Sequence, residues 1–202
     1  MLKITATIAI AVLLLPQSGP LDTREAVTFF IEDGKGVPGY RDSDRELATL
    51  ALNAWSRESG ARLKFTEAKS RDAALIRFRW ISSNEGLYGE TQRVRVNGKI
   101  GAVVYVMPQV SAQGEPLASR SAQDILLRDT IVYLTCVHEL GHAIGLPHTS
   151  QFEDIMYSFA FGGDFLNYFM RYRSKLQSRA DIATYSGLSA SDVQVLRSLY
   201  AN

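Results

Sequence analysis

The residues best suited to chemistry in this chain are three histidines and a glutamate. His138 and His142 stand four residues apart, Glu139 lies between them, and His148 follows six residues later. On a helix, residues four apart are offset by about 40° around the axis and about 6 Å along it, so both imidazoles can reach one metal ion. Imidazole nitrogen is a common zinc ligand, and zinc prefers four ligands in a tetrahedron. The spacing therefore predicts a Zn²⁺ site that is half built by this helix.

The sequence also suggests the third ligand. Gly145 lies three residues after His142, where a residue free to adopt positive φ can end the helix and turn the backbone sharply. That turn is expected to bring His148 back to the same ion. Three neutral imidazoles leave one position of the zinc open, which distinguishes a catalytic site from a structural one.

Glu139 lies beside a metal ligand and is not needed as one, so its carboxylate is free to act as a general base. Bound zinc makes a water acidic and polarises a carbonyl, and Glu139 can take the proton of that water and pass it to a departing amine. This combination predicts hydrolysis of an amide bond by a zinc-activated water. Two alternatives stay open: a zinc-binding domain without turnover that acts as a binding module, and an enzyme for non-peptide amides or very short peptides.

Two motifs of the chain resemble those of a known family. The run HELGHAIGLPH, from His138 to His148, resembles the metzincin signature, and Asp-Ile-Met156-Tyr157 resembles its Met-turn. The eleven-residue signature together with a Met-turn is a specific combination. The resemblance implies a metzincin zinc metallopeptidase.

Within the metzincins, the chain is most similar to the matrixins, over most of residues 25–202. The tyrosine after Met156, the order of the predicted elements and the closing segment 188–200 carry this similarity. The resemblance implies that Met156 forms an apolar floor beneath the zinc ligands and that Tyr157 shapes the wall of the pocket for the side chain after the scissile bond. It further implies that an extended polypeptide substrate pairs with an edge strand near 91–96.

The chain departs from the matrixin pattern in two ways. Matrixins typically carry a pro-segment cysteine that caps the zinc, whereas the single cysteine here, Cys136, lies two residues before His138 and about 200° around the helix from it. We expect Cys136 to be a packed apolar residue. Many matrixins also hold a second zinc through further histidines, and this chain has none. Activity is then restrained by export, by a protein inhibitor, or not at all. Calcium is a possible further ligand, but the sequence shows no recognisable spacing of calcium-binding residues.

The helix that carries the motif is predicted over residues 125–144, which contain no Gly or Pro except Gly141. Ser121 and Asp124 form a helix-start box ahead of it. The preceding residues 108–123 are rich in Pro, Gly, Ser and Gln, and this composition favours a loop.

Apolar and alternating segments predict five strands. An Asn-Gly pair at 97–98, favoured in two-residue type I′ turns, joins the last two into a hairpin. The polar first arm of this hairpin should be an exposed edge strand and the apolar second arm should be interior. The expected strands are 27–31, 63–65, 74–80, 91–96 and 100–107.

Two further helices show capping signatures, Ser43 with Glu46 and Ser189 with Asp192. Together with the resemblance, this order implies an α+β metzincin (zincin) fold: a twisted, five-stranded, mostly parallel sheet with an antiparallel edge strand, an active-site helix, and a small C-terminal subdomain with a final helix. The aromatic-rich stretch 159–172 favours core packing in that subdomain, with a substrate lip or a membrane-touching patch as the alternatives.

The chain begins with a leader-like segment. Its first apolar run spans about a dozen residues after Lys3, too short to cross a bilayer, and predicts a signal peptide over 1–19 with an uncleaved anchor as the alternative. One catalytic domain over 20–202 follows, with an upper part 20–148 and a lower part 149–202. We expect a secreted or periplasmic protein with no stable membrane insertion after signal removal. A net charge of +1 makes nucleic acid an improbable partner, and one cysteine allows no internal disulfide.

Overall fold

The fold is built on one mixed sheet. The structure, a computed structural model, describes residues 19–82 and 88–201. The strands follow the order β2-β1-β3-β5-β4. The pairs β1–β2, β1–β3 and β3–β5 are parallel, and β4 runs antiparallel to β5 at the edge. The predicted fold class is therefore confirmed. The strands are β1 Val27–Ile31, β2 Phe65–Glu67, β3 Ile76–Trp80, β4 Gly89–Val96 and β5 Lys99–Val106.

The β4–β5 hairpin closes at Asn97 and Gly98, as the Asn-Gly pair predicts. Both residues have positive φ, 50° and 79°, as both central positions of a type I′ turn require. β5 lies inside the sheet and β4 at its edge. Thr91 and Arg93 of β4 turn their side chains inward, and the Arg93 guanidinium donates to the carbonyl of Gly19 at 2.8 Å.

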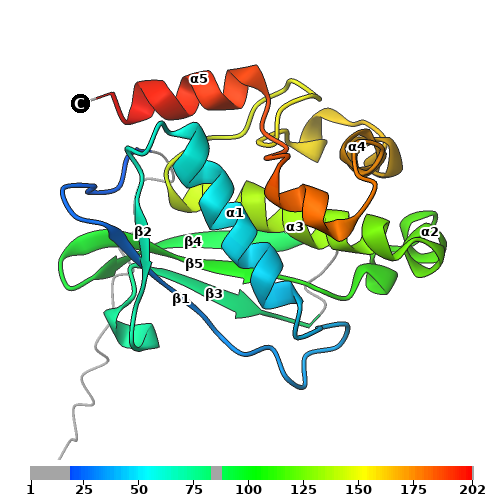
Figure 1. The fold of residues 1–202 in the computed structure, drawn as a ribbon, viewed down its shortest axis with the longest axis horizontal. Coiled ribbons are helices and arrows are strands. Elements are labelled where there is room, and N and C mark those ends of the chain that lie inside the picture. The colour runs from blue at the N-terminus through cyan, green and yellow to red at the C-terminus, as the bar shows by residue number, and fades with distance from the viewer. Residues whose placement is uncertain (1–18, 83–87, 202) are drawn as a thin grey trace, which may run out of the picture.

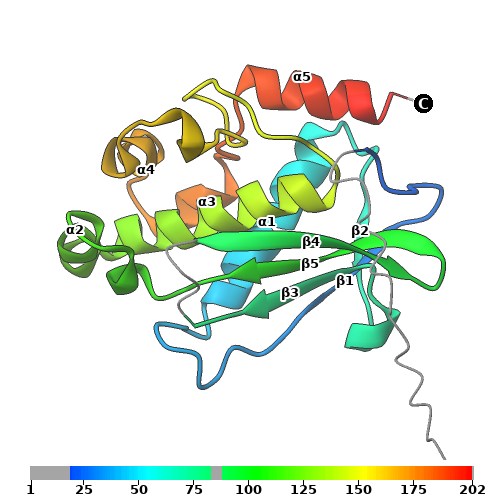
Figure 2. The same cartoon turned by 180° about the vertical axis from the view of Figure 1, so that it is seen from behind.

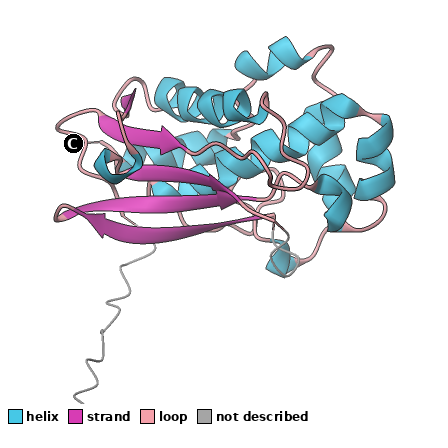
Figure 3. Ribbon diagram, turned by 90° about the horizontal axis from the view of Figure 1, so that it is seen from below, coloured by secondary structure: helices cyan, strands magenta, loops and turns pink. Residues whose placement is uncertain are grey.

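The helices cover one face of the sheet. α1 and α3 pack on that face and on each other, while α4 and α5 lie on the opposite side of α3 from β4 and β5 (Figures 1 and 2). Seen from below, the strands form one layer with the helices behind it (Figure 3). Of the helices in the described part of the chain, none combines the length and the hydropathy needed to cross a bilayer. The helices are α1 Asp44–Glu58, α2 Leu117–Gln123, α3 Ile125–Ala143, α4 Phe165–Arg173 and α5 Ala190–Leu199.

The apolar stripe of α1 forms the centre of the core. Leu47, Ala51 and Trp55 are fully buried, and burial of each large apolar side chain is worth about 1.5–3 kcal/mol. The Trp55 indole N–H also donates to the carbonyl of Val137 on α3 at 2.9 Å. α1 therefore fixes the position of the helix that carries the histidines.

The capping box predicted at the start of α1 is wrong. Ser43 has helical backbone angles, φ −70° and ψ −11°, and its side chain makes no capping hydrogen bond. The neighbouring Asp44 makes the contacts instead: its carboxylate accepts the Arg41 N–H at 2.9 Å and forms an ion pair with Arg128 of α3. Asp44 and Arg128 are both buried. A tertiary ion pair therefore takes the place of a local side-chain cap at the start of α1.

The loop predicted over 108–123 contains α2 and a short 3₁₀ turn, Val110–Gln113. Ser121 lies inside α2 and donates to a carbonyl of that helix, so the predicted Ser121–Asp124 start box is also wrong. Asp124 caps α3 alone, because its Oδ1 accepts the N–H groups of the next helix turn at 3.0 Å each. α2 has only about two turns, so its apolar periodicity is too short to indicate a helix where the composition is typical of a loop.

The predicted capping box of α5 is confirmed. The Ser189 hydroxyl oxygen accepts the Asp192 N–H at 3.0 Å, and the Asp192 carboxylate accepts the Ser189 N–H at 2.8 Å. Within 159–172, Tyr168, Phe169 and Tyr172 are buried, which supports the core interpretation for that part of the stretch.

The first described residues pack against the ends of two helices. The Gly19 N–H donates to the Gly145 carbonyl at 3.2 Å. The Leu21 N–H donates to the Tyr200 hydroxyl at 3.0 Å, and that hydroxyl donates to the Ile144 carbonyl at 2.6 Å. The remainder of the predicted signal peptide, 1–18, lies outside the described residues, and its boundary at residue 19 stays a prediction.

Candidate metal centre

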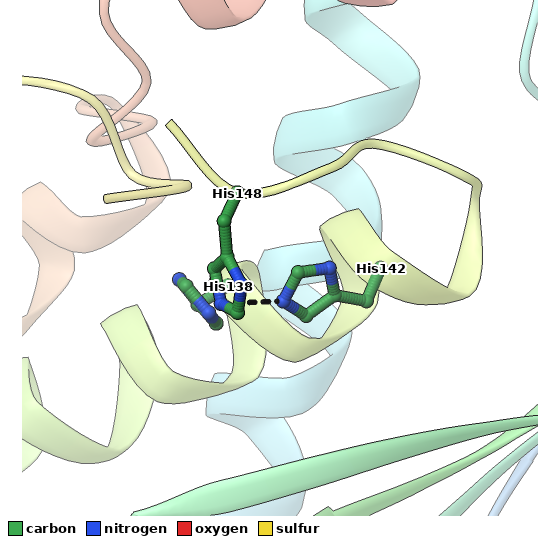
Figure 4. A group of neighbouring side chains, drawn as sticks. All are labelled: His138, His142 and His148. Atoms are coloured by element: carbon green, nitrogen blue, oxygen red, sulfur yellow. Dashed lines mark hydrogen bonds between the residues drawn. The ribbon is translucent and has the colours of Figure 1, made fainter. Parts of the chain in front are cut away.

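Three imidazoles meet at the C-terminal end of α3 (Figure 4). His138 and His142 project from the helix, and His148 comes from the loop that follows. One ring nitrogen from each lies within 4.8 Å of the others, and the Nε2 atoms of His142 and His148 are 3.1 Å apart. Tetrahedral zinc with Zn–N bonds of about 2.0–2.1 Å separates neighbouring ligand atoms by about 3.3 Å. The His142 and His148 nitrogens are therefore close to the spacing that zinc needs, and the His138 nitrogen lies within 4.8 Å of both.

Backbone carbonyls set the tautomers of the two helical ligands. The Nδ1 of His138 lies 2.6 Å from the Ile155 carbonyl, and the Nδ1 of His142 lies 2.9 Å from the Leu146 carbonyl. A carbonyl only accepts, so each Nδ1 carries the proton and donates it. The lone pair of each Nε2 is then free for a metal, the arrangement usual for metal-binding histidine.

The same histidines are held neutral. Burial is the main cause that lowers the pKa of His138 to about 3 and that of His142 to about 4. Burial also lowers the pKa of His148. Metal binding requires the neutral imidazole, so at physiological pH the three side chains are already in the ligating form.

A glycine turn delivers the third histidine. Gly145 has a φ of 103°, a value that side-chain-bearing residues rarely adopt. Its N–H donates to the His142 carbonyl at 3.0 Å, and the Leu146 N–H donates to the Gly141 carbonyl at 2.9 Å. These bonds end α3 and reverse the chain toward His148.

Met156 lies beneath the histidine-bearing turn of α3. A Cβ added at Gly141, between the two helical ligands, would lie 2.3 Å from the Met156 sulfur and 3.0 Å from the Trp55 ring. Met156 is buried, and its carbonyl accepts the Thr149 N–H at 2.8 Å. The methionine therefore fills the space left by the missing side chain at Gly141.

A chain of hydrogen bonds connects the cap of α5 to the first ligand. The Asp192 Oδ2 accepts the Ile155 N–H at 2.7 Å, and the Ile155 carbonyl accepts from His138. The Tyr168 hydroxyl lies 3.1 Å from the same carbonyl and 3.1 Å from the carbonyl of Asp154, so it shares its proton between the two. The residue that caps the last helix thus also fixes the backbone that orients a metal ligand.

The side chain of Glu139 points from α3 toward the edge strand β4. Its Oε2 accepts from the Thr91 hydroxyl at 2.8 Å. A Cβ added at Gly89 would lie 2.6 Å from the Glu139 Cγ, so Gly89 leaves room for this approach. Burial raises the pKa of Glu139 to about 7, against the opposing effect of the Thr91 hydrogen bond. A carboxyl with a pKa near neutrality can both accept and release a proton.

A cavity of about 670 Å³ adjoins the three histidines and Glu139. Several of its lining residues are aromatic, and their rings pack on one another: the Phe159 and Phe165 centroids are 3.9 Å apart, and those of Tyr88 and Phe165 are 5.4 Å apart. The cavity suits an apolar side chain of substantial size. It is lined in part by Leu134, Tyr157, Phe159, Phe165, Tyr168 and Phe169.

A family model described as Matrixin matches residues 23–164 of the chain. The match spans both the sheet and the three histidines. The chain belongs to the matrixin family. A comparison with curated proteins found no match. As a matrixin, the protein is a zinc metalloendopeptidase with a three-histidine zinc site, and the predicted zinc cofactor is confirmed.

Several residues that support the site of this matrixin were not identified from the sequence. Thr91 and Gly89 reach Glu139 from a strand 48 or more residues earlier in the chain, and no local pattern marks them. The contacts of Asp192 to the Met-turn were likewise invisible, although its capping role was predicted. Cys136 is buried and free, in agreement with its predicted packing role.

Proposed function

We propose that this matrixin is a secreted or periplasmic endopeptidase that cleaves peptide bonds within extended polypeptide segments, with Glu139 as the general base. The observation that carries the proposal is the position of the Glu139 carboxylate. It extends from the same helix turn as two of the three imidazoles and borders the same cavity. A proton acceptor, a metal site and a substrate cavity therefore meet at one point.

The chemistry divides between the metal and the side chains. The Nε2 atoms of His138, His142 and His148 would hold zinc, which when bound supplies a Lewis acid and a water of lowered pKa. Glu139 accepts a proton from the attacking water and donates it to the departing amine. Its raised pKa suits both transfers. Met156 supports the ligands from below, through its packing at Gly141.

The cavity and the edge strand favour a polypeptide substrate. Among the described residues β4 is the edge strand of the sheet, so an extended segment can add to it by backbone hydrogen bonds, which tolerate many sequences. Tyr157 stands at the cavity wall, and its hydroxyl donates to the Gly162 carbonyl at 2.8 Å. We propose that the side chain after the scissile bond enters this cavity and is large and apolar.

Location and restraint complete the proposal. The leader that the sequence predicts over 1–19, with its short apolar run, supports export. The one cysteine of the described residues is fully buried in α3 and does not serve as a zinc cap. A protein inhibitor that occupies the cavity, or separation by export alone, would then restrain the enzyme.

The test compares Glu139→Ala with wild type in casein degradation. Glu153→Ala is the matched control, because Glu153 is exposed on the loop between His148 and the Met-turn. We expect at least a hundredfold loss of activity in Glu139→Ala, one zinc per chain in all three proteins, and normal activity in the control. Equal activity in Glu139→Ala and wild type would remove Glu139 from the mechanism. Inactive but zinc-loaded wild type would instead favour a binding module.

A further inference from the structure

We propose that Thr91 is a positioning residue that holds the Glu139 carboxylate at the cavity; this inference rests on the proposed role of Glu139. Thr91 lies on β4 and Glu139 on α3. The Thr91 hydroxyl oxygen is 2.8 Å from the Glu139 Oε2 and 2.7 Å from the Glu139 carbonyl oxygen. Within the described residues, it is the one hydrogen-bond donor that reaches this carboxylate.

A count of donors shows which of the two contacts matters. A hydroxyl has a single proton and can donate it to one acceptor at a time. The carbonyl of Glu139 lies one turn before the end of α3, where the N–H of Ala143, the last residue of the helix, is its regular partner. The carboxylate has no such partner, and Glu139 is only 7% exposed. The Thr91 proton is therefore needed at Oε2, where an ionised oxygen makes the stronger bond.

Gly89 defines the other side of the same contact. It lies two residues before Thr91, and therefore on the same face of β4. A Cβ added there would lie 2.6 Å from the Glu139 Cγ and 2.9 Å from its Oε1. The strand thus leaves space for the carboxylate at Gly89 and binds it at Thr91. The two residues together restrict the side chain to one position.

Such restriction bears directly on proton transfer. A glutamate has three side-chain torsions, and a base acts only when its carboxylate is within hydrogen-bond reach of the proton that it takes. A hydrogen bond to a charged group changes equilibria and rates by roughly ten- to a hundredfold. We therefore expect loss of the Thr91 hydroxyl to lower turnover by that factor and to affect substrate affinity little, because the cavity itself is unchanged.

Thr91→Val tests the inference, because valine keeps the shape of threonine and lacks the hydroxyl. Thr91→Ser is the matched control that keeps the hydroxyl. Kinetics on a fluorogenic peptide, zinc content and thermal unfolding are measured on the same samples. We expect kcat to fall ten- to a hundredfold in Thr91→Val with KM within about twofold of wild type. Thr91→Ser should stay within about threefold, and each variant should bind one zinc.

Combination with Glu139→Ala separates the two proposals. If Thr91 acts through Glu139, adding Thr91→Val to Glu139→Ala lowers the residual rate no further. Wild-type kcat in Thr91→Val, or equal losses in the valine and serine variants, would overturn the role of Thr91 while the loss in Glu139→Ala leaves the general base intact. Wild-type activity in Glu139→Ala would overturn both.

Discussion

Replacement of Gly145 by alanine tests how the C-terminal end of α3 is built. Gly145 has a φ of 103°, and a positive φ costs an alanine roughly 1–2 kcal/mol. A Cβ at this position would also lie 1.9 Å from the Gly19 carbonyl oxygen. The first residues must then move away, which breaks the bonds of Gly19 to Gly145 and to Arg93, each worth about 1 kcal/mol.

In a protein that retains Gly19, the expected total for Gly145→Ala is a loss of about 3–4 kcal/mol, or roughly 10 °C in the unfolding midpoint for a domain of this size. Gly36→Ala is the matched control. Gly36 has a φ of 87°, and no heavy atom lies within 4 Å of an added Cβ, so only the backbone cost of roughly 1–2 kcal/mol should remain. Urea unfolding with saturating zinc measures both variants.

A shorter chain isolates the contribution of Gly19. In a protein that begins at Pro20, the atom that the new Cβ meets is gone, so the cost of Gly145→Ala should fall to that of Gly36→Ala. An equal cost of Gly145→Ala with and without Gly19 would refute the reasoning. So would a cost no greater than that of Gly36→Ala in the longer chain.

Two other perturbations follow from the contacts of α3. Burial raises the pKa of the capping Asp124, but hydrogen bonds from Arg173 and from the helix amides outweigh it, so that this pKa lies below its usual value. The stabilisation by Asp124 is therefore present above its unfolded-state pKa and is lost as the pH falls through its folded-state pKa. Asp124→Ala should cost about 1 kcal/mol at pH 7. Urea unfolding should show the free energies of unfolding of wild type and variant becoming equal in acid. Leu134 lines the cavity, so Leu134→Phe should shift cleavage toward smaller side chains after the scissile bond. Mass-spectrometric mapping of cleavage sites in a peptide mixture measures this preference. An unchanged preference would place the specificity pocket elsewhere.

Local patterns determined how much of this protein the sequence could predict. The histidine spacing on a helix and the Asn-Gly turn each depend on a few consecutive residues, and the fold class was predicted from the order of the elements together with the family resemblance. The capping box at Ser43 failed because a tertiary partner decided the outcome: Asp44 pairs with Arg128 across the fold. The box at Ser121 failed because Ser121 lies inside α2, and Asp124 caps α3 alone.

The missing parts of the site have the same explanation. Thr91 is one polar residue among several on a polar edge strand, and only the packing of β4 against α3 distinguishes it. Asp192 was recognised as a cap, yet its carboxylate also accepts N–H groups of the Met-turn, 36 residues or more away along the chain. Contacts between distant segments carry no periodicity that a single sequence can show.

The hydrogen bonds of the Ile155 backbone extend the support of His138 beyond the matched region. The matched region ends at residue 164, but Tyr168 and Asp192, which hold Ile155 by its carbonyl and its N–H, both lie beyond that point. A fragment trimmed to the matched region would keep all three histidines and lose the support that orients the first of them. The residues after 164 therefore do more than complete the fold, since two of them contact the backbone unit that orients His138.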